Sequence, residues 1–290
     1  MRDHDHSSGH SGAGHGPVLG TEAWGWALFD AVVVLALVTA AVGYAACLWA
    51  ARGRSPWPVR RTVAWYAGLV CAGAGLLGPV AAAAHTSFTA HMLGHLLLGM
   101  LAPLLLVLGA PVTLILRAVP VARARSLTRL LRSRYVRIIT HPMVAAVLNA
   151  GGLWVLYSTE LYQLMHTSAL IHGLVHAHIF LAGYLFTASL VGVDPDPHRA
   201  SVPVRSAVLI AFIAAHPILA KWLYAHPPAG VEVTDGQAGA QLMYYGGDAV
   251  DVVLIVLLFA GWYSATRPKS VADSPSGPQS TRDLQVDREH

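Results

Sequence analysis

The chain has 290 residues, of which 55% are hydrophobic and 12% are charged, and its mean hydropathy is +0.53. This composition excludes a soluble globular domain, which must keep a polar surface in water, and predicts a helical membrane protein. The net charge of +4 comes mostly from basic residues in loops and ends beside the predicted spans, so it favours membrane lipid, and not nucleic acid, as the partner of these residues.

Residues 1–22 precede the first apolar run and are rich in Gly, Ser and His. They lack an apolar core, so we expect a disordered tail and not a cleavable signal peptide. The tail carries His4, His6, His10 and His15, a composition that can collect divalent metal loosely. An added affinity tag is the alternative interpretation, and the irregular spacing of the histidines argues against it.

Seven apolar runs follow the tail, each long enough for a helix of about 20 residues to cross the hydrocarbon core. The predicted fold class is all-α, a polytopic membrane helical bundle with seven transmembrane helices in one domain over residues 23–266. Residues 267–290 are polar and turn-rich, and they predict a second disordered tail. The seven runs cover residues 24–51, 60–83, 88–117, 141–158, 170–192, 205–225 and 240–264.

The basic residues predict the orientation of this bundle. All of them except Arg2 and Lys221 lie in or beside the connections after the first, third and fifth runs, or after the seventh. Lys and Arg are retained on the cytoplasmic side of membrane proteins, so we expect the N-terminus outside and the C-terminus in the cytoplasm. The arginine-rich stretch 120–139 is expected to form an amphipathic helix on the inner membrane surface.

Histidine and aspartate side chains lie soon after the start of the third, fifth and seventh runs, where an ionisable group is costly in hydrocarbon. All three runs enter from the predicted outer side, so these side chains share the outer half of the membrane. Each histidine pair is spaced i, i+4 and presents two imidazoles on one helix face. The six side chains are His91 and His95, His172 and His176, and Asp248 and Asp251.

Neutral imidazole with carboxylate suits a copper, zinc or iron ion, so the six side chains predict a metal or haem site. A proton-handling or structural polar network is the alternative. His216 is a weaker candidate, because Pro217 kinks the sixth span beside it. We expect His85, His166 and His226 in the outer loops to be solvated, with a place on the access path as the second possibility.

The sequence lacks the motifs that several kinds of chemistry require. Cys47 and Cys71 have no thiolate metal-binding spacing and are expected to pack between helices. The sequence contains no Ser/His/Asp array, P-loop or dinucleotide fingerprint. We therefore expect no enzymatic activity.

Five motifs carry a resemblance to a known family. They are H-M-L-G-H-L-L-L-G-M-L-A-P-L-L-L-V-L-G-A-P over 91–111, H-P over 141–142 with Trp154 following, H-G-L-V-H-A-H-I-F-L-A-G-Y-L-F over 172–186, V-G-V-D-P over 191–195, and G-G-D-A-V-D over 246–251. With these motifs the chain between residues 24 and 265 resembles the CtaG-like cytochrome c oxidase assembly factors of bacteria, in their actinobacterial branch. Val175 departs from many members, which carry an acidic or polar residue there.

The resemblance implies a multi-pass protein of the bacterial plasma membrane that is needed to form an active haem-copper oxidase, by supplying or inserting copper. Its expected partners are cytochrome c oxidase subunits. A single-span copper chaperone that shares the CtaG name uses cysteine ligands, which this chain lacks, so copper binding must rest on the six side chains above. Two alternatives stay open: a b-type haem protein in which His91 with His172, or His95 with His176, ligates the iron, and a metal or small-solute transporter.

Overall fold

The computed structural model describes residues 18–266, and most of the two predicted tails lies outside this range. Within it the secondary structure is helical, without strands, so the predicted all-α fold is confirmed. Six helical segments are long and apolar enough to cross a membrane. They comprise α1 (Val18–Ala50), α2 and α3 (Val59–Leu76 and Gly78–Ala84), α4 to α6 with the π-helix η1 (Phe88–His95, Leu96–Leu101, Ala102–Leu108 and Pro111–Ala118), α12 (Ala169–Val191), α13 (Val202–Ala225) and α14 (Val233–Thr266).

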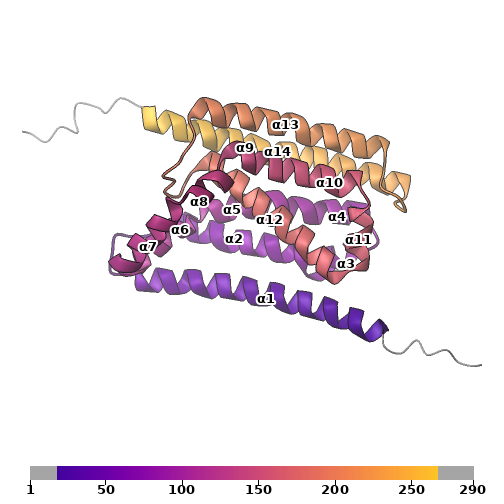
Figure 1. Ribbon diagram of the computed structural model, residues 1–290, viewed down its shortest axis with the longest axis horizontal. Helices are drawn as coiled ribbons and strands as arrows, with labels where there is room; N and C mark the ends of the chain where they lie inside the picture. The colour runs from indigo at the N-terminus through magenta and orange to yellow at the C-terminus, as the bar shows by residue number, and fades with distance from the viewer. Residues whose placement is uncertain (1–17, 267–290) are drawn as a thin grey trace, which may run out of the picture.

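The fourth predicted span is bent. Its residues form α9 (Pro142–Ala146), the π-helix η2 (Val147–Gly151) and α10 (Gly152–Ser158), and then α11 (Leu161–Thr167) turns away by 80°. The count is therefore six spans, or seven if the bent pair is one span. The turn brings α11 over the end of the bundle where α4, α12 and α14 begin (Figure 1).

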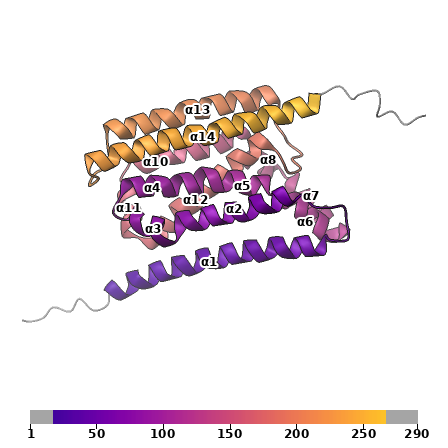
Figure 2. The same ribbon diagram turned by 180° about the vertical axis from the view of Figure 1, so that it is seen from behind.

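The two ends of the bundle differ in chemistry. Figure 1 and Figure 2 show α3 and α11 at one end and, at the other, α6 with the short helices α7 (Val121–Leu131) and α8 (Arg134–Ile139). The helices α7 and α8 carry the arginines of the stretch 120–139, where the sequence predicts an amphipathic surface helix. We call the opposite end, where α3 and α11 lie, the histidine end.

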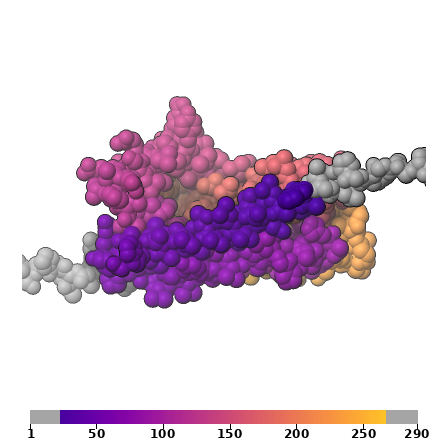
Figure 3. Space-filling model, turned by 90° about the horizontal axis from the view of Figure 1, so that it is seen from below, coloured from indigo at the N-terminus to yellow at the C-terminus, as the bar shows by residue number. Residues whose placement is uncertain are grey.

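The third span is the centre of the fold and α1 is its edge. In the third span 61% of the residues in the apolar stretch are buried, against 6% in α1. Figure 3 shows α1, in indigo, lying across one face of the molecule. A helix with so little buried surface is held by few contacts and is the easiest one to move.

Glycines bring α12 and α2 close to the third span. A Cβ on Gly183 would lie 2.1 Å from the carbonyl oxygen of Gly99, so only glycine allows the α12 backbone this position. Pro103, four residues after Gly99, has no N–H to donate to that oxygen, which explains a local departure from α-helical bonding in η1. Gly75 and Gly94 also lie close together, since a Cβ on Gly75 would lie 3.0 Å from the carbonyl oxygen of Gly94, and such small residues allow α2 and α4 to approach closely.

Two aspartates from distant parts of the chain cap helices in the third span. The carboxylate of Asp235 accepts hydrogen bonds from the backbone N–H groups of Phe88 (2.6 Å) and Thr89 (3.1 Å) at the start of α4. The carboxylate of Asp194 accepts hydrogen bonds from the N–H groups of Val112 (3.1 Å) and Thr113 (2.7 Å) at the start of α6. A carboxylate satisfies free N–H groups and the helix dipole at such a position, so each aspartate fixes one end of the span.

Candidate metal centre

Five histidines gather at the histidine end, and they come from four helices. They are His85 at the end of α3, His91 on α4, His166 on α11, and His172 and His176 on α12. All five line one cavity of about 20 Å³, whose other walls are Gly75, Ala81, Ala84 and Gly94. A space of this size holds one water-sized particle or one ion. We call these five side chains the five-histidine cluster.

The rings of the cluster form a continuous series. The centroids of His172 and His176 lie 4.1 Å apart. His85 lies 6.0 Å from His172 and 6.2 Å from His166, and His166 lies 6.0 Å from His91. Since the i, i+4 spacing places His172 and His176 on one face of α12, the predicted pairing on this helix is observed.

Hydrogen bonds orient three of the rings and leave one nitrogen of each unused. Nδ1 of His176 lies 2.9 Å from the carbonyl oxygen of His172, and Nδ1 of His166 lies 2.7 Å from that of Tyr162. A carbonyl only accepts, so in both rings Nδ1 carries the proton and Nε2 keeps its lone pair. Nε2 of His91 lies 3.0 Å from the hydroxyl of Tyr157, which leaves Nδ1 for another partner. Metal-binding histidines commonly have such support at the second nitrogen.

Exposure falls along the cluster. His85 is exposed, His166, His172 and His176 are half-buried, and His91 is 5% exposed. Nδ1 of His172 is buried without a hydrogen-bond partner. The cluster therefore leads from the surface of the histidine end into the bundle.

The remaining predicted residues lie deeper and form a separate group. His95 and His216 are stacked with ring centroids 6.3 Å apart, and Asp251 is buried on α14. Asp248 is half-buried and lies one turn before Asp251. The sequence places six side chains in one band, whereas the structure divides them between the five-histidine cluster and this deeper group. One helical turn separates His91 from His95, and the ring of His95 stacks on the ring of His216 in α13.

In the described part of the chain, no three or more His, Cys, Asp or Glu side chains are already arranged to hold a metal ion. A metal bound by the five-histidine cluster therefore requires rotation of side chains. The free nitrogens of His166 and His176 and the exposure of His85 are compatible with such a rotation, because half-buried and exposed side chains can change rotamer.

The sequence predicted solvated or access-path positions for His85 and His166, and the structure places His85 exposed and His166 half-buried in the cluster. It did not predict the contacts of Tyr157 and Asp235. The position of His166 depends on the 80° bend before α11. No local pattern indicates such a bend. His178 and His226 are exposed, and each lies within hydrogen-bonding distance of a backbone carbonyl, that of Leu148 and Trp222 respectively.

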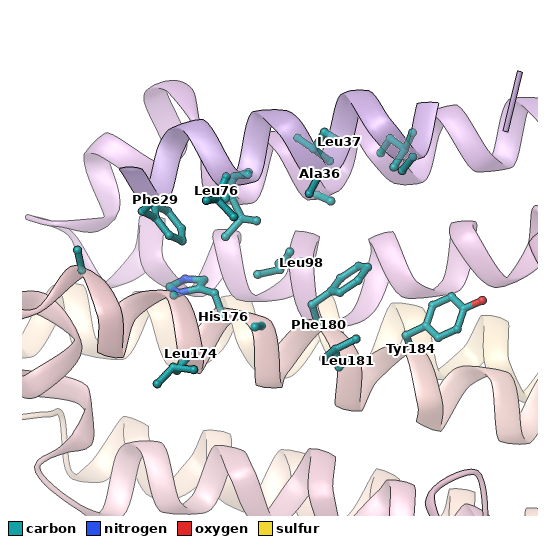
Figure 4. Close-up of a pocket in the computed structure, with 18 of the residues that line it drawn as sticks. Phe29, Ala36, Leu37, Leu76, Leu98, Leu174, His176, Phe180, Leu181 and Tyr184 are labelled. Atoms are coloured by element: carbon teal, nitrogen blue, oxygen red, sulfur yellow. The ribbon is translucent and has the colours of Figure 1, made fainter. Parts of the chain in front are cut away.

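A lateral cleft of about 760 Å³ lies between α1, α2 and α12, and His176 lines both this cleft and the histidine cavity. Figure 4 shows Phe29, Ala36 and Leu37 of α1 on one side of the cleft and His176 with Phe180 of α12 on the other. The walls are almost wholly apolar, as in sites for lipophilic groups. The cluster can thus be approached from the histidine end and from the side.

Comparison with known proteins identifies relatives but no structural precedent. An uncharacterized protein of Mycobacterium bovis and one of Mycobacterium tuberculosis are each 38% identical to this chain over 200 residues, and one of Mycobacterium leprae is 32% identical over 196 residues. Each match covers 65% of this chain and 30% of the relative, so the chain spans less than a third of these relatives. No solved structure gives a significant match. The profile of the cytochrome c oxidase caa3 assembly factors matches residues 42–265, and the chain therefore belongs to this family of bacterial membrane proteins.

Proposed function

We propose that this protein binds copper at the five-histidine cluster and supplies it to a subunit of a haem-copper cytochrome c oxidase during assembly. Membership in the assembly-factor family supports the role in oxidase assembly. The copper step is our addition and rests on the side chains of the cluster.

The observation that carries the proposal is the hydrogen bonding of the histidines. Since His166 and His176 donate from Nδ1 to backbone carbonyls, their Nε2 lone pairs are available, and both residues line a cavity of about 20 Å³ that three more histidines also line. Imidazole is a good ligand for copper. Without thiolates, such a site releases its ion to protons or competing ligands, as a protein that delivers copper requires.

The size of the cavity favours a metal ion over haem. A porphyrin is far larger than the space between the five rings, and it would have to separate α4 from α12 to reach His91 and His172. A single ion needs only side-chain rotation. A b-type haem ligated by His91 and His172 therefore requires a larger rearrangement than the copper site does.

The orientation of the protein follows from the arginines in this proposal. The arginine-rich helices α7 and α8 lie at the end opposite the cluster. If these helices face the cytoplasm, the five-histidine cluster faces the outer side of the plasma membrane. Copper would then be transferred to an oxidase subunit docked alongside in the same membrane.

Elemental analysis and a visible spectrum of the detergent-purified full chain test the copper step. His4, His6, His10 and His15 are replaced by Ser in every sample, so that the N-terminal histidines contribute no metal. We expect bound copper, no Soret band, and less copper in the His91→Ala/His172→Ala double variant. His178→Ala is the matched control, because His178 lies on α12 but is exposed and faces Leu148. Equal copper in the double variant and its parent would refute the assignment, and a Soret band would favour haem.

A further inference from the structure

We propose a second cation site, deeper in the bundle than the five-histidine cluster, formed by the imidazoles of His95 and His216 and the carboxylate of Asp251. The inference deepens the proposed function, because the ion that we assign to this site is the copper that the five-histidine cluster receives. The two sites have different ligands, so each can be removed without the other.

The first observation is that all three side chains are buried and have no hydrogen-bond partners. His95 is 5% exposed, and His216 and Asp251 are each 2% exposed. Both ring nitrogens of His95, both of His216 and both carboxylate oxygens of Asp251 are buried and have no hydrogen-bond partner. Buried polar atoms are nearly always satisfied, so six unsatisfied atoms from three neighbouring elements point to a ligand that these side chains bind together.

The position of the three side chains is the second observation. The ring of His216 lies over Gly247, where a Cβ would come within 2.5 Å of Cε1. Asp251 follows Gly247 by four residues and therefore lies on the same face of α14. Helical side chains lean toward the N-terminus of their helix, so the carboxylate of Asp251 leans back toward the level of the His216 ring.

Charge is the third observation. Among the described residues Asp251 has no Lys or Arg within salt-bridge distance, and an isolated carboxylate buried in hydrocarbon is strongly disfavoured. A bound cation would supply the missing positive charge and occupy the imidazole lone pairs. Two nitrogens and one carboxylate oxygen are a ligand set that suits a first-row transition metal ion. Among the described residues these three side chains are not yet arranged around an ion, so binding requires them to draw together.

The second site also has a path to it. The ring of His166 lies 6.2 Å from that of His85 and 6.0 Å from that of His91, His95 follows His91 by one helical turn, and the ring of His95 lies 6.3 Å from that of His216. The series His85, His166, His91, His95 and His216 thus leads from an exposed residue to a buried one. An ion that enters at the histidine end can move along it by exchange of one imidazole for the next.

Copper stoichiometry of the full chain tests this proposal, again with the four N-terminal histidines replaced by Ser. The protein is loaded with copper under ascorbate, desalted and analysed for metal. We expect two coppers per chain in the parent and one in His216→Gln and in Asp251→Asn. The His172→Ala/His176→Ala variant should also keep one copper, held at the deeper site, and His226→Gln, an exposed histidine on the boundary of α13, should keep two.

The outcomes separate the two proposals. A parent that binds a single copper, lost only in variants of the five-histidine cluster, would overturn the second site and leave the proposed function standing. Two coppers that persist in both His216→Gln and Asp251→Asn would likewise overturn it and would place the second ion elsewhere. Loss of copper from the deeper site alone would support it. If a buried variant fails to fold, a parent that binds only one copper still overturns the second site, and so does a His172→Ala/His176→Ala variant that keeps none, since that variant leaves the deeper side chains intact.

Discussion

The carboxylate of Asp235, at the start of α14, lies 2.6 Å from the backbone nitrogen of Phe88, at the start of α4. The last span of the chain therefore fixes the first turn of the helix that carries His91 and His95. Ser87 caps the same turn locally by accepting a hydrogen bond from the N–H of Ala90, whereas Asp235 ties this turn to α14.

Asp235→Ala should lower stability and weaken copper binding together. Loss of an N-cap carboxylate costs about 1–2 kcal/mol, and the freed first turn of α4 no longer holds His91 against Tyr157. Asp194→Ala is the matched control, because Asp194 caps α6 at the opposite end. We expect a similar loss of thermal stability in both variants, measured in detergent, and weaker copper binding only in Asp235→Ala. Equal copper affinities would show that the cap does not position the site.

Tyr157→Phe should weaken copper binding without changing the fold. The substitution removes the hydroxyl that lies 3.0 Å from Nε2 of His91 and leaves the ring in place. Loss of such a supporting hydrogen bond typically lowers metal affinity by about 10–100-fold. Competition titration with a copper chelator measures the effect.

Tyr162→Phe is the control for this substitution. The Tyr162 ring packs 4.7 Å from that of His166, and its backbone carbonyl, which lies 2.7 Å from His166 Nδ1, is unchanged by the substitution. We expect near-parental affinity in Tyr162→Phe. A Tyr157→Phe variant that binds as tightly as Tyr162→Phe would contradict the supporting role of Tyr157.

Gly183→Ala should destabilise the bundle by about 1–3 kcal/mol, since its Cβ would meet the Gly99 carbonyl oxygen at 2.1 Å. The carbonyl group that the new Cβ would meet belongs to the backbone, so no flexible side chain can move aside. Gly261→Ala is the control, because nothing lies within 4 Å of a Cβ there. Thermal unfolding in detergent should show a clear decrease for the first variant and no decrease for the second. A parental midpoint for Gly183→Ala would show that α12 can move away from η1.

Copper affinity should fall as the pH is lowered from 7.5 to 5.5. Imidazole must be neutral to bind a metal, and an ordinary histidine takes up a proton near pH 6.5. Protons therefore compete with copper on the acid side, and the apparent affinity should decrease by about tenfold or more over this range. Equilibrium dialysis at each pH, with circular dichroism to confirm that the helices persist, measures the effect. A flat profile would show that histidines which take up a proton in this pH range contribute little to copper binding.

Hydropathy alone predicted the spans, since each run of apolar residues carries its own evidence for a membrane helix. The sequence also paired His172 with His176, because i, i+4 geometry is local. It did not separate His91 from His95, because which neighbouring helix each ring meets depends on how α4, α12 and α13 pack. The place of His166 depends on a bend after Ser158 that no local pattern indicates.

The lateral cleft beside His176 has one wall made by residues 25–40 of α1. The family profile starts at residue 42, so it leaves this part of the helix out. Substitutions along Phe29, Ala36 and Leu37 would disturb few buried contacts, because so little of α1 is covered. This wall can therefore change without displacing the five-histidine cluster, which would let one helical bundle be adapted to different neighbours in the membrane.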